Sequence, residues 1–246
     1  MTLAIRGDRA SCLSVQLGPR TWLLAVARGF GSIGGLATEA ALLARLRAEC
    51  ERRVRSARFR RAIDRPQSAA TAMHAVLTRI NGDLYACTAS HEDYVTAGAS
   101  LTAVVVVAGH AHVLHAGATA AYLARDGEVV ALCVDDVFDE RRRPLLGRAF
   151  VTDSSLDVAI SSAALLAGDA IVLLERRLRG EADRRALLTS LDASDPGEHV
   201  LVARFEHDDA LGDDASANAG RRRNAAPAIA RAAAALAFAL AAVFAH

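Results

Sequence analysis

Aromatic residues are scarce in this sequence, because Phe, Trp and Tyr make up only 4% of its 246 residues. The apolar 52% is therefore mostly alanine, leucine and valine, a composition that suits helices and buried strands and excludes a disordered chain. Cysteines are few and none lies in a C-x-x-C pair, so we expect reduced core residues rather than disulfides or metal ligands. They are Cys12, Cys50, Cys87 and Cys133.

Nucleotide-binding, hydrolase and secretion signals are also missing. The glycines between Gly29 and Gly35 are not followed by the Lys-Ser/Thr of a Walker A loop, and Ser32 does not stand in a G-x-S-x-G elbow. These glycines instead permit a tight turn from a strand into a helix. Residues 1–12 lack the apolar stretch of a signal peptide, so we expect a cytoplasmic domain.

Charge of one sign is missing as well, since the formal net charge is +1. No global field therefore draws the chain to nucleic acid, and no aromatic residues are interleaved with the arginine clusters to stack on bases. Nucleic acid is not an expected partner. We interpret the arginine-rich run from Arg52 to Arg61 as the solvated face of a helix.

Hydrophobic patterning predicts two strands, two helices and then a run of strands around a last helix. The first strands are expected at 10–17 and 21–27, and the helices at 36–63 and 67–85. Asp126-Gly127 is a strong hairpin signal, because glycine readily takes the positive φ of such a turn. The later strands are expected at 101–108, 112–116, 120–125, 129–134, 157–161, 170–175 and 200–205, with a helix at 182–191.

The composition changes after His207. Residues 208–224 have an acidic half and a basic half among small polar residues, which predicts a flexible linker. Residues 225–246 are Ala-rich and apolar and predict a helix that attaches the domain to a membrane, with Arg221–Arg223 as the cytoplasmic flank. The uninterrupted apolar part, 232–245, spans only about 21 Å as a helix. An interfacial, partner-binding or packed soluble helix therefore stays open.

Four segments are informative through their order and spacing. They read LAVARGFG at 24–31, LHAGATAAYL at 114–123, RDGE at 125–128 and LAGDAIVLL at 166–174. They resemble A-D-G-M-G-G, H-V-G-D-S-R-A-Y-L, R-D-G-E and L-x-x-G-D-x-L-L-L-C of the bacterial metal-dependent Ser/Thr protein phosphatases (PPM, type 2C). The resemblance covers about residues 8–206 and implies an α+β fold. That fold is a four-layer α/β/β/α sandwich of two antiparallel sheets flanked by helices, here spanning residues 1–207.

The chain departs from the family at the positions that hold the catalytic Mg²⁺ or Mn²⁺ ions. Arg28 stands where the resemblance implies the Asp of D-G-M-G-G, Ala118 replaces the Asp of G-D-S, and Arg176 replaces the Asp of S-D-G-L. Asp8 and Asp195 are candidate remnants of the two other acidic motifs. A guanidinium is cationic and has no lone pair for a metal, so we expect no metal cofactor.

The leading hypothesis is therefore a pseudophosphatase, which binds or regulates a phosphoprotein or kinase-pathway partner without hydrolysis. Arg28 and Arg176 are candidate anion-binding residues, because arginine forks match the geometry of phosphate. Alternatively, they pair with nearby carboxylates and replace the metal ions in a structural role. A second hypothesis is an active, divergent phosphatase that uses displaced ligands, and a third is a membrane-tethered interaction module without phosphate recognition. The displaced ligands weighed are Asp8, Asp169, Glu175 and Asp195.

The string His110, His112 and His115 suggests zinc at first sight. On a strand, however, His110 and His112 share one face while His115 points to the other. No cysteine or acidic residue lies near them in the sequence. Ordinary turn and strand histidines are therefore expected.

Overall fold

The structure is a computed structural model that describes residues 2–6, 10–31, 35–89, 97–134, 136–140, 143–192 and 200–206. All of these residues belong to one structural unit, Met1–His207. The linker 208–224 and the apolar segment 225–246 lie outside the described residues, so membrane attachment stays a prediction. Within the described ranges, no helix is both long and apolar enough to cross a membrane.

The strands form two antiparallel five-stranded sheets. One has the order β1-β12-β11-β6-β7 and the other β10-β5-β4-β3-β2, while β8 and β9 make a separate hairpin. Their bounds are β1 Thr2–Arg6, β2 Cys12–Gly18, β3 Thr21–Phe30, β4 Gly98–Val107, β5 His110–Ala116, β6 Ala120–Arg125, β7 Glu128–Ala131, β8 Val137–Glu140, β9 Arg143–Leu146, β10 Ala159–Ala164, β11 Ala170–Leu174 and β12 Val200–Glu206.

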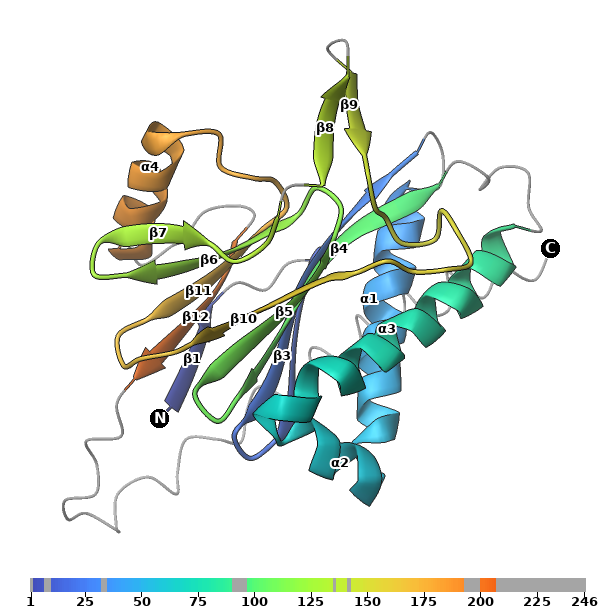
Figure 1. The fold of residues 1–246 in the computed structure, drawn as a ribbon, viewed down its shortest axis with the longest axis horizontal. Coiled ribbons are helices and arrows are strands. Elements are labelled where there is room, and N and C mark those ends of the chain that lie inside the picture. The colour runs from blue at the N-terminus through green and yellow to red at the C-terminus, as the bar shows by residue number, and fades with distance from the viewer. Residues whose placement is uncertain are drawn as a thin grey trace. The chain divides into compact units, whose positions relative to one another are not determined.

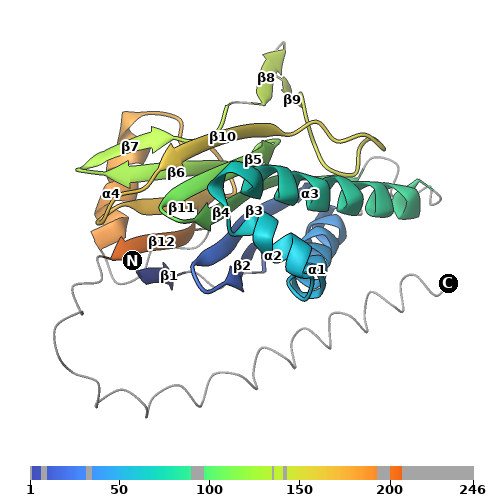
Figure 2. The same ribbon diagram turned by 60° about the horizontal axis from the view of Figure 1, so that its bottom comes forward.

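The helices cover the outer faces of the two sheets (Figures 1 and 2). Helices α1 (Gly35–Arg53), α2 (Ala57–Ile63) and α3 (Pro66–Thr88) pack on the sheet that contains β3, and α4 (Glu181–Asp192) packs beside β7. The layers are therefore helix, sheet, sheet and helix. This arrangement confirms the predicted four-layer sandwich.

Strand β3 separates two hydrophobic cores, which explains why its sequence is apolar without alternation. Leu23 and Ala25 face the core between this sheet and helices α1 and α3. Leu24 and Val26 face the second core, between the two sheets. All four side chains are fully buried, as expected for a strand that is covered on both faces. This strand therefore forms a rigid base for the residues at its end.

The structure differs from the predicted elements in three places. The single helix expected over 36–63 is two helices, with a break after Arg53 at which Val54 turns partly into the core. β1 was not expected at all, nor was the β8–β9 hairpin. The Asp126-Gly127 turn has the predicted positive φ values, 51° and 77°.

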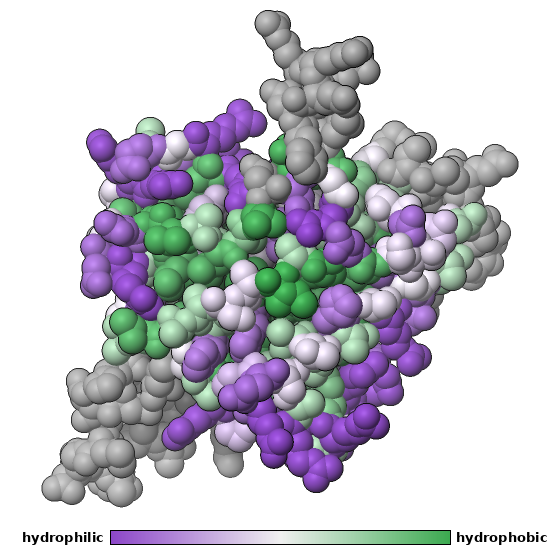
Figure 3. All heavy atoms as spheres, in the orientation of Figure 1, coloured by the Kyte–Doolittle hydropathy of each residue, from purple (hydrophilic) through white to green (hydrophobic). Residues whose placement is uncertain are grey.

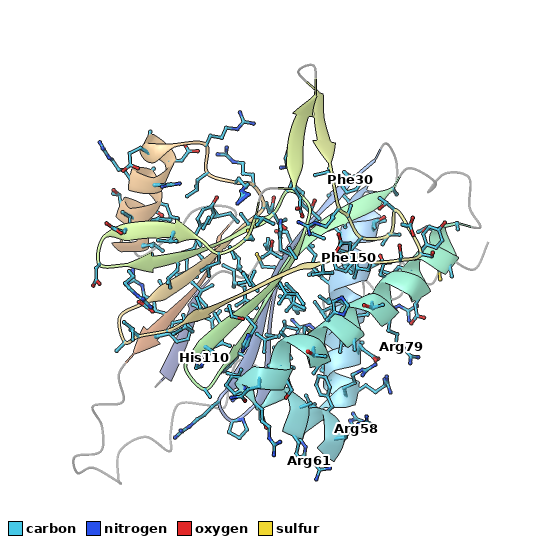
Figure 4. The ribbon with its side chains drawn as sticks, viewed as in Figure 1. Phe30, Arg58, Arg61, Arg79, His110 and Phe150 are labelled. Carbon is cyan, nitrogen blue, oxygen red and sulfur yellow. The ribbon has the colours of Figure 1, made fainter. Side chains whose placement is uncertain are left out.

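The segment between β9 and β10 is fixed to the sandwich by two contacts. Phe150, labelled in Figure 4, exchanges two backbone hydrogen bonds with Ala99, of 2.8 and 3.1 Å. The fully buried Asn81 amide of α3 accepts a 2.7 Å bond from the Val151 N–H and donates a 2.9 Å bond to the Asp153 carbonyl. Val151 is held at a φ of 70°, which is unusual for a β-branched residue. This segment carries Arg148 into a buried polar cluster.

Candidate functional site

The ends of β3 and β11 meet at one edge of the sandwich, and Ser11 joins them. The Ser11 carbonyl accepts a 2.9 Å hydrogen bond from the Ala27 N–H of β3. The Ser11 hydroxyl donates a short hydrogen bond to the Glu175 carboxylate, directly after β11. Arg28 follows Ala27 and Arg176 follows Glu175, so two arginines lie at the same edge, and both are exposed.

Helix α1 adds a second carboxylate to this edge. Glu39 accepts a 2.8 Å hydrogen bond from the Gly29 N–H through its Oε2 atom. Burial raises the pKa of the Glu39 carboxyl, the bond from Gly29 lowers it, and the nearby Glu175 carboxylate raises it further. The Arg28 guanidinium lowers the same pKa. Glu39, Glu175 and Arg28 therefore form one electrostatically connected group.

The loop that follows β5 borders the site by contacting β4, the strand that pairs with β3. Ser100 is the partner of Arg28 in the β3–β4 register, and its hydroxyl accepts a 2.9 Å bond from the Ala118 N–H. Gly117 has a φ of 105°, and a Cβ there would lie 2.3 Å from the Ser100 hydroxyl. The glycine thus lets the Ala118 loop approach the Arg28 end of β3 closely.

A cavity of about 270 Å³ opens beside Arg176, between the end of β11 and α4. Its lining combines charged groups with apolar ones. The charged residues are Glu175, Arg176, Arg177 and Asp183, and the apolar ones include Leu174, Leu178 and Leu187. The site edge therefore continues into a hollow that is able to take a side chain of a bound ligand.

A buried polar cluster supports the Ala118 loop from below. Asp136 is 2% exposed and accepts hydrogen bonds from the Gly117 N–H at 3.0 Å and from Arg148 Nε at 3.0 Å. His115 Nε2 lies 3.4 Å from the same carboxylate, and its Nδ1 is 2.9 Å from the Thr102 hydroxyl. Burial lowers the pKa of His115 to about 4, although Asp136 opposes the shift. The Arg177 and Arg148 cations lower it further.

This histidine predicts a loss of stability in mild acid. Because the folded pKa lies below the unfolded value of about 6.5, its contribution is complete above pH 6.5 and is lost as the pH falls toward 4. The shift corresponds to about 3 kcal/mol over that window. We expect His115→Gln to reduce the pH dependence of the urea midpoint between pH 7 and 4.5. Parallel curves for the two proteins would contradict this assignment.

The sequence matches no family model and no curated protein, but the fold is similar to solved structures of Ser/Thr phosphatases. The Ser/Thr phosphatase of S. agalactiae superimposes with a TM-score of 0.64 at 14% identity, over 83% of this chain and 100% of its own. The phosphatase PstP/Ppp of Mycobacterium tuberculosis gives 0.60 at 21% identity, over 84% and 99%. PppA, described as a key regulatory component of T6SS in Pseudomonas aeruginosa, gives 0.61 at 18%, over 82% and 96%.

This domain has the PPM phosphatase fold. The three positions that the resemblance singled out, Arg28, Ala118 and Arg176, lie around one edge of that fold, as the contacts above show. The candidate remnants Asp8 and Asp195 lie outside the described residues. Within the described part of the chain, Arg28 and Arg176 form no ion pair, although the Arg28 guanidinium lowers the pKa of Glu39. Pairing of these arginines with nearby carboxylates therefore stays a prediction.

The described side chains do not fit the metal pair of the PPM phosphatases. Two of the carboxylates at the site edge are already hydrogen-bonded, Glu39 to Gly29 and Glu175 to Ser11. Across the described ranges, no three His, Cys, Asp or Glu side chains are grouped to hold a metal ion. A hard divalent cation takes about six oxygen ligands, and Arg28 and Arg176 supply none.

Two other predicted candidates have structural roles. Asp169, weighed as a displaced ligand, lies at the opposite end of β11 from Glu175, where its two oxygens accept bonds of 2.8 and 2.6 Å from Arg125. His110 and His112 stack with ring centroids 6.3 Å apart, and His112 bonds Ser162 at 2.7 Å. His115 belongs to the Asp136 cluster instead, so the three histidines do not converge.

Four residues of the site were not found from the sequence: Ser11, Glu39, Asp136 and Arg148. None belongs to a motif that we matched, and each reaches the site through a contact between distant segments. One signal was available for Glu39. It lies in the second turn of the helix that follows the glycine-rich turn, and so returns toward the end of β3.

Proposed function

We propose that this chain is a catalytically inactive PPM-fold domain that binds a phosphorylated protein in a Ser/Thr phosphorylation system. The observation that supports this proposal most directly is the position of Arg28. Its guanidinium is a cation at the end of β3 that lowers the pKa of Glu39, on which Glu175 also acts. In the family this position belongs to a metal ligand. A cation there repels a divalent ion, since two unit charges 4 Å apart interact by about 4 kcal/mol at an effective dielectric of 20.

The same substitution favours an anion. Arg28 and Arg176 are exposed and free of ion pairs within the described residues, so their guanidinium donors are available to phosphate oxygens. The cavity beside Arg176 has room for a neighbouring side chain of the ligand. A phosphoryl group would then be held at the former metal position without a metal-generated hydroxide to attack it.

The context of phosphorylation signalling comes from the fold neighbours. Two of them are Ser/Thr phosphatases, and PppA is described as a regulatory component. A domain with this fold that binds phosphate without hydrolysing it would protect a phosphorylated site from dephosphorylation or recruit the protein that carries the site. The expected partner is therefore a phosphoprotein or a protein of the kinase pathway.

We expect no turnover of p-nitrophenyl phosphate by the full chain with Mn²⁺ or Mg²⁺, but binding of a phosphothreonine peptide by calorimetry. Arg28→Gln with Arg176→Gln should weaken that binding at least tenfold, because a hydrogen bond to a charged group contributes about 1.5–3 kcal/mol. Arg185→Gln on α4 is the matched control, since Arg185 is exposed and pairs with Glu181.

The outcomes separate the hypotheses. Turnover that a chelator abolishes would support the divergent phosphatase instead. Absence of turnover together with equal binding of phosphorylated and unphosphorylated peptides would favour an interaction module without phosphate recognition. Equal phosphopeptide affinity in the double variant and in Arg185→Gln would remove Arg28 and Arg176 from the binding site.

A further inference from the structure

A strongly basic segment lies away from this site, at the end of α1. Seven of the fourteen residues from Arg52 to Arg65 are arginines and only Asp64 is acidic. Figure 3 shows hydrophilic side chains gathered over α2 and the adjoining part of α3. Arg58 and Arg61 extend outward from α2 in Figure 4. We call residues 52–65 the arginine segment.

Most of these cations have no acidic partner among the residues that the structure describes. Glu49 takes the two at the end of α1, with bonds of 2.6 Å from Arg52 and from Arg53, and its pKa falls to about 2 mainly through Arg52. Asp64 accepts the Thr21 hydroxyl at 2.6 Å. Within the described residues no ion pair involves the remaining arginines. These are Arg55, Arg58, Arg60, Arg61 and Arg65.

A groove of about 580 Å³ runs between the end of α1, α2 and the start of α3. Arg52, Arg53 and Arg58 line its sides, and Ser56 and Thr71 add hydroxyl groups. Its apolar lining residues are Phe59, Ala62, Ala72 and Ala75. Phe59 is 8% exposed and is covered by the Arg53 guanidinium, 5.9 Å from the ring centroid.

We propose that this groove binds an acidic peptide segment of a partner protein. Of the three arginines that line the groove, Arg52 and Arg53 share Glu49, and Arg58 forms no ion pair within the described residues. This excess of positive charge around a concave surface is stabilised by a ligand of opposite charge that enters the groove. The apolar lining residues suit the aliphatic parts of Glu or Leu side chains between the carboxylates. An extended or helical peptide inserts into such a groove, whereas a partner protein with a flat surface does not.

Two other anionic partners fit less well. Single-stranded nucleic acid needs exposed aromatic rings for stacking, and the ring in the groove is buried under Arg53. A membrane-bound surface usually inserts large apolar side chains among its cations. The exposed large apolar residues of the described chain all lie outside the arginine segment; they are Leu36, Val130, Val134, Ile160 and Leu166.

The groove is distinct from the proposed phosphate site. Helix α1 begins at Gly35, beside Gly29 at the site edge, and ends at Arg53. Its 19 residues span about 28 Å at 1.5 Å per residue. A ligand in the groove therefore does not share contacts with Arg28. Acidic-peptide binding is expected whether or not the phosphate proposal holds.

The test uses the full chain and a fluorescein-labelled decapeptide of eight Glu and two Leu, followed by anisotropy at low and physiological salt. We expect binding that weakens with salt, and about tenfold weaker binding in Arg58→Gln with Arg61→Gln. Arg79→Gln is the matched control, because Arg79 is an exposed arginine of α3 that pairs with Asp83 at 3.8 Å. Circular dichroism melts verify that all variants fold.

Each result decides the question. A peptide with Gln in place of every Glu should not bind, and Arg79→Gln should bind like the unaltered chain. Equal loss in Arg79→Gln would show a diffuse charge effect and overturn the groove. Tighter binding of phosphatidylserine vesicles or of oligouridylate than of the peptide, lost in the double variant, would assign the segment to a membrane or to RNA instead.

Discussion

Asp136→Ala is expected to lower the free energy of unfolding by about 3 kcal/mol. The Asp136 carboxylate is buried and holds three groups together: the Gly117 N–H, Arg148 and, at 3.4 Å, His115 Nε2. Removing one partner of a buried pair leaves the other charge uncompensated, at a cost of about 3–5 kcal/mol. We expect the lower end of this range, because the Arg148 side chain is 23% exposed to solvent.

Asp157 provides the matched control, because it approaches the same Arg148 side chain at 3.8 Å. The Asp157 side chain is 81% exposed, so Asp157→Ala should change stability by less than about 1 kcal/mol. Urea titrations of the two variants compare a buried and an exposed carboxylate on the same guanidinium. Similar midpoints for both would mean that Asp136 is not the structural centre of this cluster.

The sequence predicted the parts of the fold that depend on local patterning. The apolar run in β4 and the Asp126-Gly127 turn require only neighbouring residues, and both were found at their places. The break between α1 and α2 was missed because 54–56 contains neither proline nor glycine. Val54 departs from helical geometry and packs partly against the core, so the break depends on tertiary contacts.

The hairpin of β8 and β9 was missed for the opposite reason. Its sequence, VFDE followed by RRRPLL, is dominated by charged residues and carries no alternating apolar pattern. Among the described strands, β8 and β9 pair with each other and with no third strand. Strand β1 is short and lies at the edge of its sheet, so its signal is similarly weak.

The candidate site was only half accessible to sequence reasoning. Positions 28, 118 and 176 followed from the resemblance, because motifs carry register along a strand. Asp136 and Arg148 are twelve residues apart, on either side of the β8–β9 hairpin, and Asn81 fixes the segment that follows Arg148 at Val151. Such contacts depend on packing between elements, and this packing produces no periodic pattern in the sequence.

Gly29→Ala is expected to lower the free energy of unfolding by at least about 3 kcal/mol, the upper range for overpacking. A Cβ on Gly29 would lie 1.7 Å from the Gly35 carbonyl oxygen and 2.3 Å from its carbon, both backbone atoms that no side-chain rotation moves aside. The first turn of α1 would have to leave the end of β3. The bond from the Gly29 N–H to Glu39 would break with it.

Gly82→Ala on α3 is the matched control, because a Cβ there meets nothing within 4 Å. Alanine is favoured over glycine inside a helix, so this variant should gain about 0.5–1 kcal/mol. Thermal melts with opposite shifts would show that Gly29 is required for packing, independently of Arg28, which stands where the resemblance implies an Asp. A folded Gly29→Ala with an unchanged melting temperature would disprove the close approach of α1, and with it the placement of Glu39 beside Arg28.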